Sequence, residues 1–203
     1  MLITFEGTEG CGKSTLIQNL SRILSEQKIS HIVTREPGGS SVAESIRNVI
    51  LDQEMHPLTE LFLYEAARAE HFQKTVMPAL KKKQIVLCDR FTDSTLAYQG
   101  FARGLDLKMI KLLNEVATEK RAPDLTFFLD LPVEIGLERA SDPNRFELEG
   151  VKFQKKVRKG FLHSIQKDKK RWQVIKVLHK SPEEVCEEAL AIILKKKKAA
   201  KAR

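Results

Sequence analysis

The stretch that decides the fold lies at residues 5–15 and reads Phe5-Glu6-Gly7-Thr8-Glu9-Gly10-Cys11-Gly12-Lys13-Ser14-Thr15. It contains the pattern G-x-x-x-x-G-K-[ST], whose glycines let successive backbone N–H groups curl around phosphate oxygens. The apolar run at residues 2–5 predicts a strand before it, and the apolar stripe at residues 13–27 predicts a helix after it. The order strand, glycine-rich loop, helix predicts a phosphate site between the two elements.

The loop predicts ATP binding by a set of nine residues. They are Gly7, Thr8, Glu9, Gly10, Cys11, Gly12, Lys13, Ser14 and Thr15. Lys13 is expected to reach the β- and γ-phosphates, and the Ser14 hydroxyl is expected to bind Mg²⁺, the predicted cofactor. A regulatory GTPase would also carry a guanine-reading Asn-Lys-x-Asp, which the sequence lacks. A P-loop switch or an ATPase stimulated by nucleic acid stays open as the alternative class.

Outward from the loop, apolar runs alternate with stretches of helical periodicity. Strands are expected at residues 2–5, 31–34, 85–88, 125–131 and 173–178, and helices at 13–27, 42–51, 59–80, 107–120, 133–140, 148–170 and 182–195. The alternation predicts an α/β fold, with a five-stranded parallel sheet flanked by helices on both faces, in a single domain over residues 1–195. Pro78 is expected to break or kink the third helix. Ligands of such sheets bind beyond the carboxyl ends of the strands.

The bulk properties exclude several other classes of protein. The 203 residues carry a net charge of +8, much of it in a lysine run near the C-terminus. We expect residues 196–203 to form a disordered basic tail, and because no aromatic residues interleave with its lysines, we expect no specific nucleic-acid partner. No apolar run is long enough for a membrane span and the start lacks a signal peptide, so a cytoplasmic protein is expected. The three scattered cysteines predict neither disulfides nor a zinc site.

The third predicted strand ends in Asp89-Arg90, where an acidic and a basic residue follow a buried run. The Asp89 carboxylate suits a metal ion, and the arginine suits an anionic substrate because its planar fork binds phosphate and stays charged. Arg35, Arg47 and Arg68 are further candidates. Tyr64 lies one helical turn before Arg68, so both project from one face, where the ring offers a platform for a base. Phe62 on the same helix is expected to point into the core.

Four blocks of this sequence, taken together, resemble the thymidylate kinases of bacterial type, within the P-loop nucleoside monophosphate kinases. They are the loop at residues 5–15, Thr34-Arg35-Glu36-Pro37-Gly38-Gly39, Leu61-Phe62-Leu63-Tyr64-Glu65-Ala66-Ala67-Arg68, and Asp89-Arg90-Phe91-Thr92-Asp93-Ser94-Thr95-Leu96-Ala97-Tyr98-Gln99-Gly100. The resemblance spans residues 1 to about 180. It implies an enzyme that transfers the γ-phosphate of ATP to dTMP with Mg²⁺, and a homodimer that packs helices together. Another nucleoside monophosphate kinase or a deoxynucleoside kinase is the alternative within this class.

The resemblance also assigns roles to residues of the acceptor site. It implies that Arg90 and Arg47 hold the acceptor phosphate, and that Arg68 bonds the thymine carbonyl while Tyr64 stacks on the base. It implies that Ser94 or Thr95 reads the N3 edge of thymine, and that Tyr98 excludes a ribose 2′-OH. Glu9 would contact the 3′-OH of the acceptor or the metal shell. The remaining acceptor-site residues that it implies are Glu36, Pro37, Gln99 and Phe146.

Residues 139–150 occupy the position of the family's lid over ATP. The loop between Gly7 and Gly12 holds no arginine, so the resemblance implies that basic groups come from the lid. Arg145 is the expected transition-state cation, completing a catalytic set with Lys13, Arg90 and Glu9. Arg139 is expected to pack on adenine. Glu147 is expected to join Ser14 and Asp89 around the metal, partly through water.

Overall fold

The computed structural model describes residues 1–139 and 145–201. Its centre is one sheet of five strands: β1 (Leu2–Glu6), β2 (His31–Arg35), β3 (Ile85–Asp89), β4 (Leu125–Asp130) and β5 (Trp172–Lys176), in the order β2-β3-β1-β4-β5. Every neighbouring pair is parallel. The predicted α/β fold with a five-stranded parallel sheet is therefore confirmed. In the described part of the chain, no helix is both long and apolar enough to cross a bilayer.

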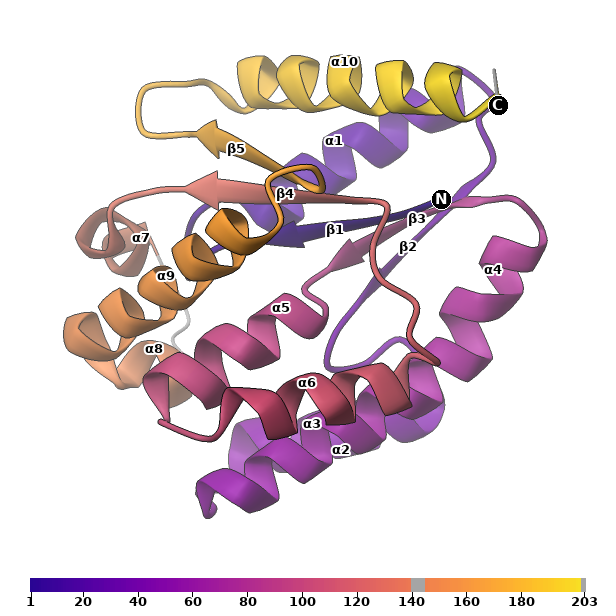
Figure 1. The fold of residues 1–203 in the computed structure, drawn as a ribbon. Helices are drawn as coiled ribbons and strands as arrows, with labels where there is room; N and C mark the ends of the chain where they lie inside the picture. Colours follow the sequence, from indigo (N-terminus) through magenta and orange to yellow (C-terminus); the bar gives the residue numbers. More distant parts are fainter. Residues whose placement is uncertain (140–144, 202–203) are drawn as a thin grey trace.

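Helices cover both faces of the sheet (Figure 1). On one face α1 (Lys13–Glu26) lies beside α10 (Pro182–Lys201), and their apolar stripes enclose a core with β1, β3, β4 and β5. The other face carries α2 (Ser41–Asp52), α3 (Pro57–His71), α4 (Met77–Lys81), α5 (Thr92–Thr95), α6 (Leu107–Ala117) and α9 (Gly150–Lys167). The three central strands, β3, β1 and β4, read as nearly continuous apolar runs because both of their faces are buried. Two short helices, α7 (Val133–Arg139) and α8 (Arg145–Leu148), lie near the carboxyl ends of the strands.

The helix expected at residues 59–80 contains a π-helical segment that was not predicted. It is α-helical from Pro57 to His71, winds as a π-helix, η1 (Phe72–Val76), and then returns to α4. Pro78 falls in the first turn of α4, where its missing N–H is tolerated. The chain therefore stays helical through the proline, and the irregularity lies in the wider turns just before it.

Other parts of the structure also differ from the expectation. Residues 92–102, for which no helix was expected, form α5 and a π-helix, η2 (Leu96–Ala102). Threonine, serine, aspartate and glycine are weak helix formers, and this segment is held by packing against α9, α6 and α3. The last helix extends to Lys201, past the expected boundary at residue 195, since lysine is a good helix former. Phe62 is 52% exposed, so its expected place in the core was wrong.

Candidate active site

The phosphate loop follows β1 and leads into α1, as its motif predicts. Lys13 folds back over the loop, and its Nζ donates hydrogen bonds to the carbonyl oxygens of Thr8 at 3.1 Å and Gly7 at 3.3 Å. Gly10 has φ +68°, and a Cβ there would lie 1.9 Å from the carbonyl oxygen of Gly136 in α7. Only glycine fits this contact, so the loop packs directly on α7, the helix that leads into the lid region.

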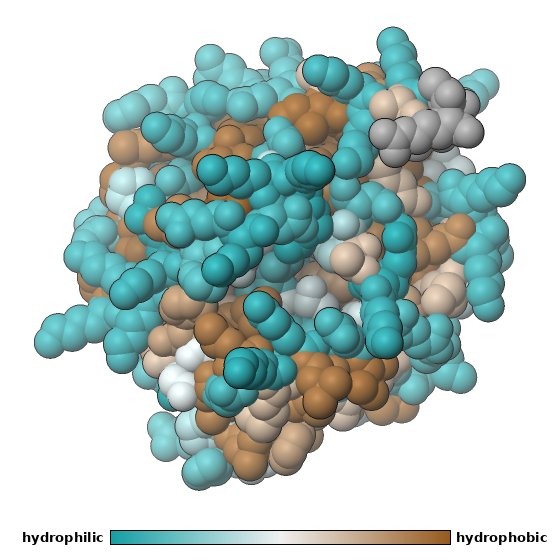
Figure 2. Space-filling view, in the orientation of Figure 1, coloured by the Kyte–Doolittle hydropathy of each residue, from teal (hydrophilic) through white to brown (hydrophobic). Residues whose placement is uncertain are grey.

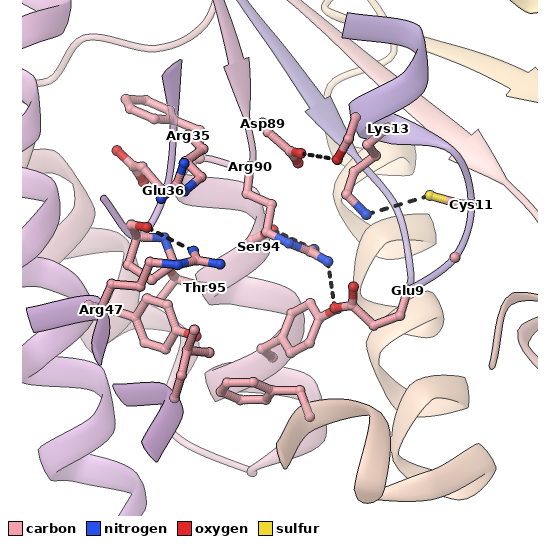
Figure 3. A pocket seen from close by; sticks show the side chains of 18 of the residues that line it. Glu9, Cys11, Lys13, Arg35, Glu36, Arg47, Asp89, Arg90, Ser94 and Thr95 are labelled. Atoms are coloured by element: carbon pink, nitrogen blue, oxygen red, sulfur yellow. Dashed lines mark hydrogen bonds and ion pairs between the residues drawn. The ribbon is translucent and has the colours of Figure 1, made fainter. Parts of the chain in front are cut away.

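One cavity of about 620 Å³ opens beside this loop, at the carboxyl ends of β1, β2 and β3 (Figure 3). It brings together most of the expected site residues. From the loop it is lined by Glu9, Gly10, Cys11, Gly12, Lys13, Ser14 and Thr15, and from the rest of the chain by Glu36, Pro37, Arg47, Tyr64, Arg68, Asp89, Arg90, Ser94, Thr95, Tyr98, Gln99, Arg139 and Phe146, with Arg35, Leu51 and Phe91 in addition. Gly7 and Thr8 do not line it.

Ser14 and Asp89 form an oxygen-rich corner of the cavity. The Ser14 hydroxyl donates to Asp89 Oδ2 at 3.2 Å. Asp89 Oδ1 is buried and has no hydrogen-bond partner among the described residues. A hydroxyl and a carboxylate with an unused oxygen are the hard ligands that Mg²⁺ prefers, so these two residues fit a magnesium site. Within the described ranges, no group of three His, Cys, Asp or Glu side chains is placed to hold a metal ion by itself.

Arg90 lies at the centre of the cavity, directly after β3 (Figure 3). Its backbone has φ +67°, a left-handed conformation that costs energy for a bulky residue. The guanidinium donates to Gly7 O at 3.1 Å, to Ser94 Oγ at 3.3 Å and to Glu9 Oε1 at 2.5 Å. It also lies 5.1 Å from the centre of the Tyr98 ring. This strained turn aims a fixed cation at the middle of the cavity.

Glu9 is held between Arg90 and Tyr98, whose hydroxyl donates to Glu9 Oε1 at 2.8 Å. Burial by itself would raise the pKa of Glu9, but the positive charges of Arg90 and Lys13 outweigh burial and lower this pKa to about 2. Glu9 is therefore ionised at any physiological pH.

A second carboxylate, that of Glu6, supports the site from behind the Arg90 turn and was not predicted from the sequence. Its side chain accepts from the Phe91 N–H at 2.8 Å and from the Ser94 hydroxyl at 2.5 Å, so it braces both sides of the Arg90 turn. Burial and the nearby charge of Asp93 raise the pKa of Glu6 to about 8. The only sequence signal was an acidic residue at the end of an otherwise apolar strand. Ser94 is thereby turned toward Glu6 and Arg90.

The other end of the cavity is aromatic. The rings of Tyr64 and Tyr98 lie 6.4 Å and 5.9 Å from the ring of Phe146, measured between centroids. Phe146 lies at the start of α8, and it is buried against these rings. The three side chains come from α3, η2 and α8, so this end closes where three helices meet.

Arg68 lies in the wall beside this aromatic end and is almost fully buried. Its guanidinium makes five hydrogen bonds inside the protein, to Glu36, Glu65, Asn114, Thr95 and the carbonyl of Phe91. A base carbonyl would have to take over one of these bonds. Gln99 lies nearby, and its Nε2 donates to Glu60 Oε1 at 2.7 Å. Neither Glu60 nor Asn114 belongs to a motif, so neither was predicted from the sequence.

The remaining expected arginines lie at the rim. Arg47 is partly buried and donates to the carbonyl of Pro37 at 2.9 Å, which places it between α2 and the Glu36-Pro37 turn. Arg35 is half exposed and paired with Glu44 at 2.7 Å. Arg139 also lines a second cavity of about 240 Å³ on the other side of the loop, with Gly10, Leu129, Val177, Lys180 and Pro182 among its walls.

Part of the predicted lid lies outside the described residues. This applies to residues 140–144 and to the side chains of Arg145 and Glu147. Their expected contacts with the transition state and the metal stay predictions.

Comparisons with known proteins all lead to one family. The family model for thymidylate kinase matches residues 5–189. The thymidylate kinase of Geotalea uraniireducens is 51% identical over 185 residues, which covers 85% of this chain and 87% of that protein. That of Desulfovibrio desulfuricans is 43% identical and covers 97% and 98%. The crystal structure of thymidylate kinase from Ehrlichia chaffeensis superposes with a TM-score of 0.79 at 35% identity, covering 95% of this chain and 98% of that one.

Proposed function

Since the chain belongs to the thymidylate kinase family and is thus an enzyme that phosphorylates dTMP, we propose that it transfers the γ-phosphate of ATP directly to the dTMP phosphate inside the 620 Å³ cavity. One observation carries this proposal: Lys13 of the phosphate loop, Arg90 and the aromatic end around Tyr64 line the same cavity. The phosphates of the donor and of the acceptor can therefore bind next to each other in one cavity. Such in-line transfer depends on positioning and charge neutralisation, and it needs no covalent enzyme intermediate.

At the donor end, the loop from Gly7 to Thr15 binds the ATP phosphates, with Lys13 leaving the carbonyls of Gly7 and Thr8 for phosphate oxygens. Ser14 and Asp89 would hold Mg²⁺, which neutralises phosphate charge when bound. The second cavity suits adenine, because Leu129, Val177 and Pro182 offer apolar surface and Arg139 a cation to lie over the ring.

At the acceptor end, Arg90 and Arg47 bind the dTMP phosphate. Arg90 exchanges its bond to Glu9 for bonds to phosphate oxygens, and the released Glu9 carboxylate accepts from the 3′-OH. No general base is required, since the acceptor oxygen already carries negative charge. Tyr64 stacks on thymine, and Tyr98 fills the space beside the sugar 2′ carbon. Arg145 supplies the transition-state cation from the lid.

We also propose that the enzyme is a homodimer formed through α2, α3 and α6. Five large apolar side chains on these adjacent helices are exposed: Val42, Val49, Phe62, Leu112 and Val116. Figure 2 shows hydrophobic side chains gathered on the lower part of that view, where Figure 1 places these helices. A contiguous exposed apolar surface of this kind is typical of a protein interface.

The test is an acceptor panel with the purified full-length protein. ADP formation is measured with ATP, Mg²⁺ and each of dTMP, dUMP, CMP, UMP and GMP. We expect dTMP to give the highest kcat/KM. ATP turnover that showed no preference for dTMP, or that rose with RNA or DNA instead, would overturn the assignment and favour the alternatives.

A further inference from the structure

Beneath the aromatic end of the cavity, Glu60 of α3 holds Gln99 of η2. Both side chains are 1% exposed, and Gln99 Nε2 donates to Glu60 Oε1 at 2.7 Å. Arg103 forms an ion pair with the same Glu60 oxygen at 3.4 Å. As a carboxylate, Glu60 accepts hydrogen bonds and cannot donate them.

The carboxylate dictates how the Gln99 amide is turned. Because Glu60 offers only acceptors, the NH₂ group of Gln99 has to face it, and the amide oxygen is the polar atom that remains for the cavity. Within the described ranges, this oxygen takes part in no hydrogen bond, and it is absent from the buried polar atoms that lack a partner. It therefore has access to the cavity as an acceptor.

Thr95 provides the opposite polarity beside it. Its Oγ1 accepts a hydrogen bond from Arg68 Nη2 at 2.9 Å, so its hydroxyl hydrogen is left to donate into the cavity. The wall thus presents an acceptor from Gln99 and a donor from Thr95. Thymine and uracil match this pair with N3–H and the C4 carbonyl. Cytosine reverses both groups, because its N3 accepts and its 4-amino group donates.

We propose that Glu60 is a specificity-determining positioning residue, which fixes the Gln99 amide so that the site accepts pyrimidines with a hydrogen on N3 and rejects cytosine. The proposal rests on the function proposed above and names what selects its acceptor. A site built to pair one hydrogen-bonding pattern discriminates strongly against the reversed pattern, since mismatched polar groups stay buried and unpaired.

Glu60→Gln tests the proposal in the full-length enzyme, with kcat/KM measured for dTMP, dUMP and dCMP. A glutamine at this position can donate as well as accept, so it no longer dictates the orientation of Gln99. We expect the ratio of kcat/KM for dTMP to that for dCMP to fall about tenfold or more. The ratio for dTMP to dUMP is the internal control and stays unchanged, since both bases carry N3–H.

The double variant Glu60→Gln/Gln99→Glu, in which the two side chains are exchanged, tests whether discrimination against dCMP can be restored. The carboxylate that it introduces at position 99 accepts from the amide introduced at position 60, and it offers its second oxygen, again an acceptor, to the cavity. Discrimination against dCMP should return relative to Glu60→Gln alone. If Glu60→Gln instead lowers kcat/KM for all three acceptors by the same factor, Glu60 is only structural and the proposal is overturned. Failure of the proposed function is distinct, because the wild-type enzyme would then show no preference for dTMP.

Discussion

The guanidinium of Arg90 touches both halves of the cavity, since it bonds the phosphate-loop carbonyl of Gly7 and the acceptor-side Glu9 and Ser94. These contacts use the planar fork of arginine from one fixed position. A lysine carries the same charge on a single, more mobile group, which cannot span several partners at once. The shape of this side chain therefore matters as much as its charge.

Arg90→Lys should lower kcat with dTMP by about 100-fold, because the bidentate contact that positions the acceptor phosphate is lost. The measurement is steady-state ADP formation at saturating ATP and dTMP. Arg22→Lys, an exposed arginine of α1 paired with Glu26, is the matched control and should leave kcat unchanged. A variant that kept half of the wild-type kcat would contradict the role given to Arg90.

Glu6→Gln should make the protein more stable than the wild type at alkaline pH. Glu6 faces Asp93, Ser94, Arg90 and the Phe91 N–H, and its pKa is raised to about 8 by burial first and then by Asp93. Between its unfolded pKa of about 4.5 and a folded pKa of about 8, the native state binds a proton that the unfolded chain has released. The free energy of unfolding therefore falls as pH rises through this window.

Glutamine cannot ionise, yet it can still accept from Phe91 and bond Ser94. The stability of the variant relative to the wild type should rise by at most about 1.4 kcal/mol for each pH unit within the window. Urea denaturation of both proteins at pH 6 and pH 8.5 measures this difference. A constant difference at the two pH values would argue against the raised pKa.

At the scale of elements, α7 is fixed to the phosphate loop by a contact between two glycines. A Cβ on Gly136 would lie 2.3 Å from the carbonyl oxygen of Glu9. Gly136→Ala should therefore push the loop from its position, lowering stability by about 1–3 kcal/mol and kcat/KM for ATP by about tenfold. Thermal denaturation and ATP titration measure the two effects. Glu138→Ala, at an exposed position of the same helix, should change neither.

The elements that sequence predicted well are those that local patterns specify. The five strands and the loop between β1 and α1 follow from apolar runs and glycine spacing within a few residues of each other. The missed features depend on contacts between distant residues. Glu60 meets Gln99, 39 positions away, and Glu6 meets Ser94, 88 positions away. Periodicity places Phe62 on a helix surface but does not show whether another element covers it.

At the scale of the whole molecule, the exposed apolar side chains of α2, α3 and α6 predict association of two copies. Phe62→Glu places a charge in the middle of that surface, and burying an unpaired charge is costly, so the dimer should dissociate into monomers. Sedimentation velocity at micromolar concentration gives the mass of each species. Val174→Glu, which alters an exposed apolar side chain on β5, is the control and should stay dimeric. A monomeric wild type would contradict the dimer.

The single cavity that joins the phosphate loop to the aromatic end also has a consequence for inhibitor design. A compound that bridged both ends would need several negative charges to satisfy Lys13, Arg47 and Arg90, and such compounds enter cells poorly. The aromatic end offers Tyr64, Phe146 and Leu51 as apolar contacts, with Gln99 and Thr95 as a hydrogen-bonding pair. An uncharged compound with a thymine-like edge could therefore compete with dTMP while leaving the cationic half of the cavity untouched.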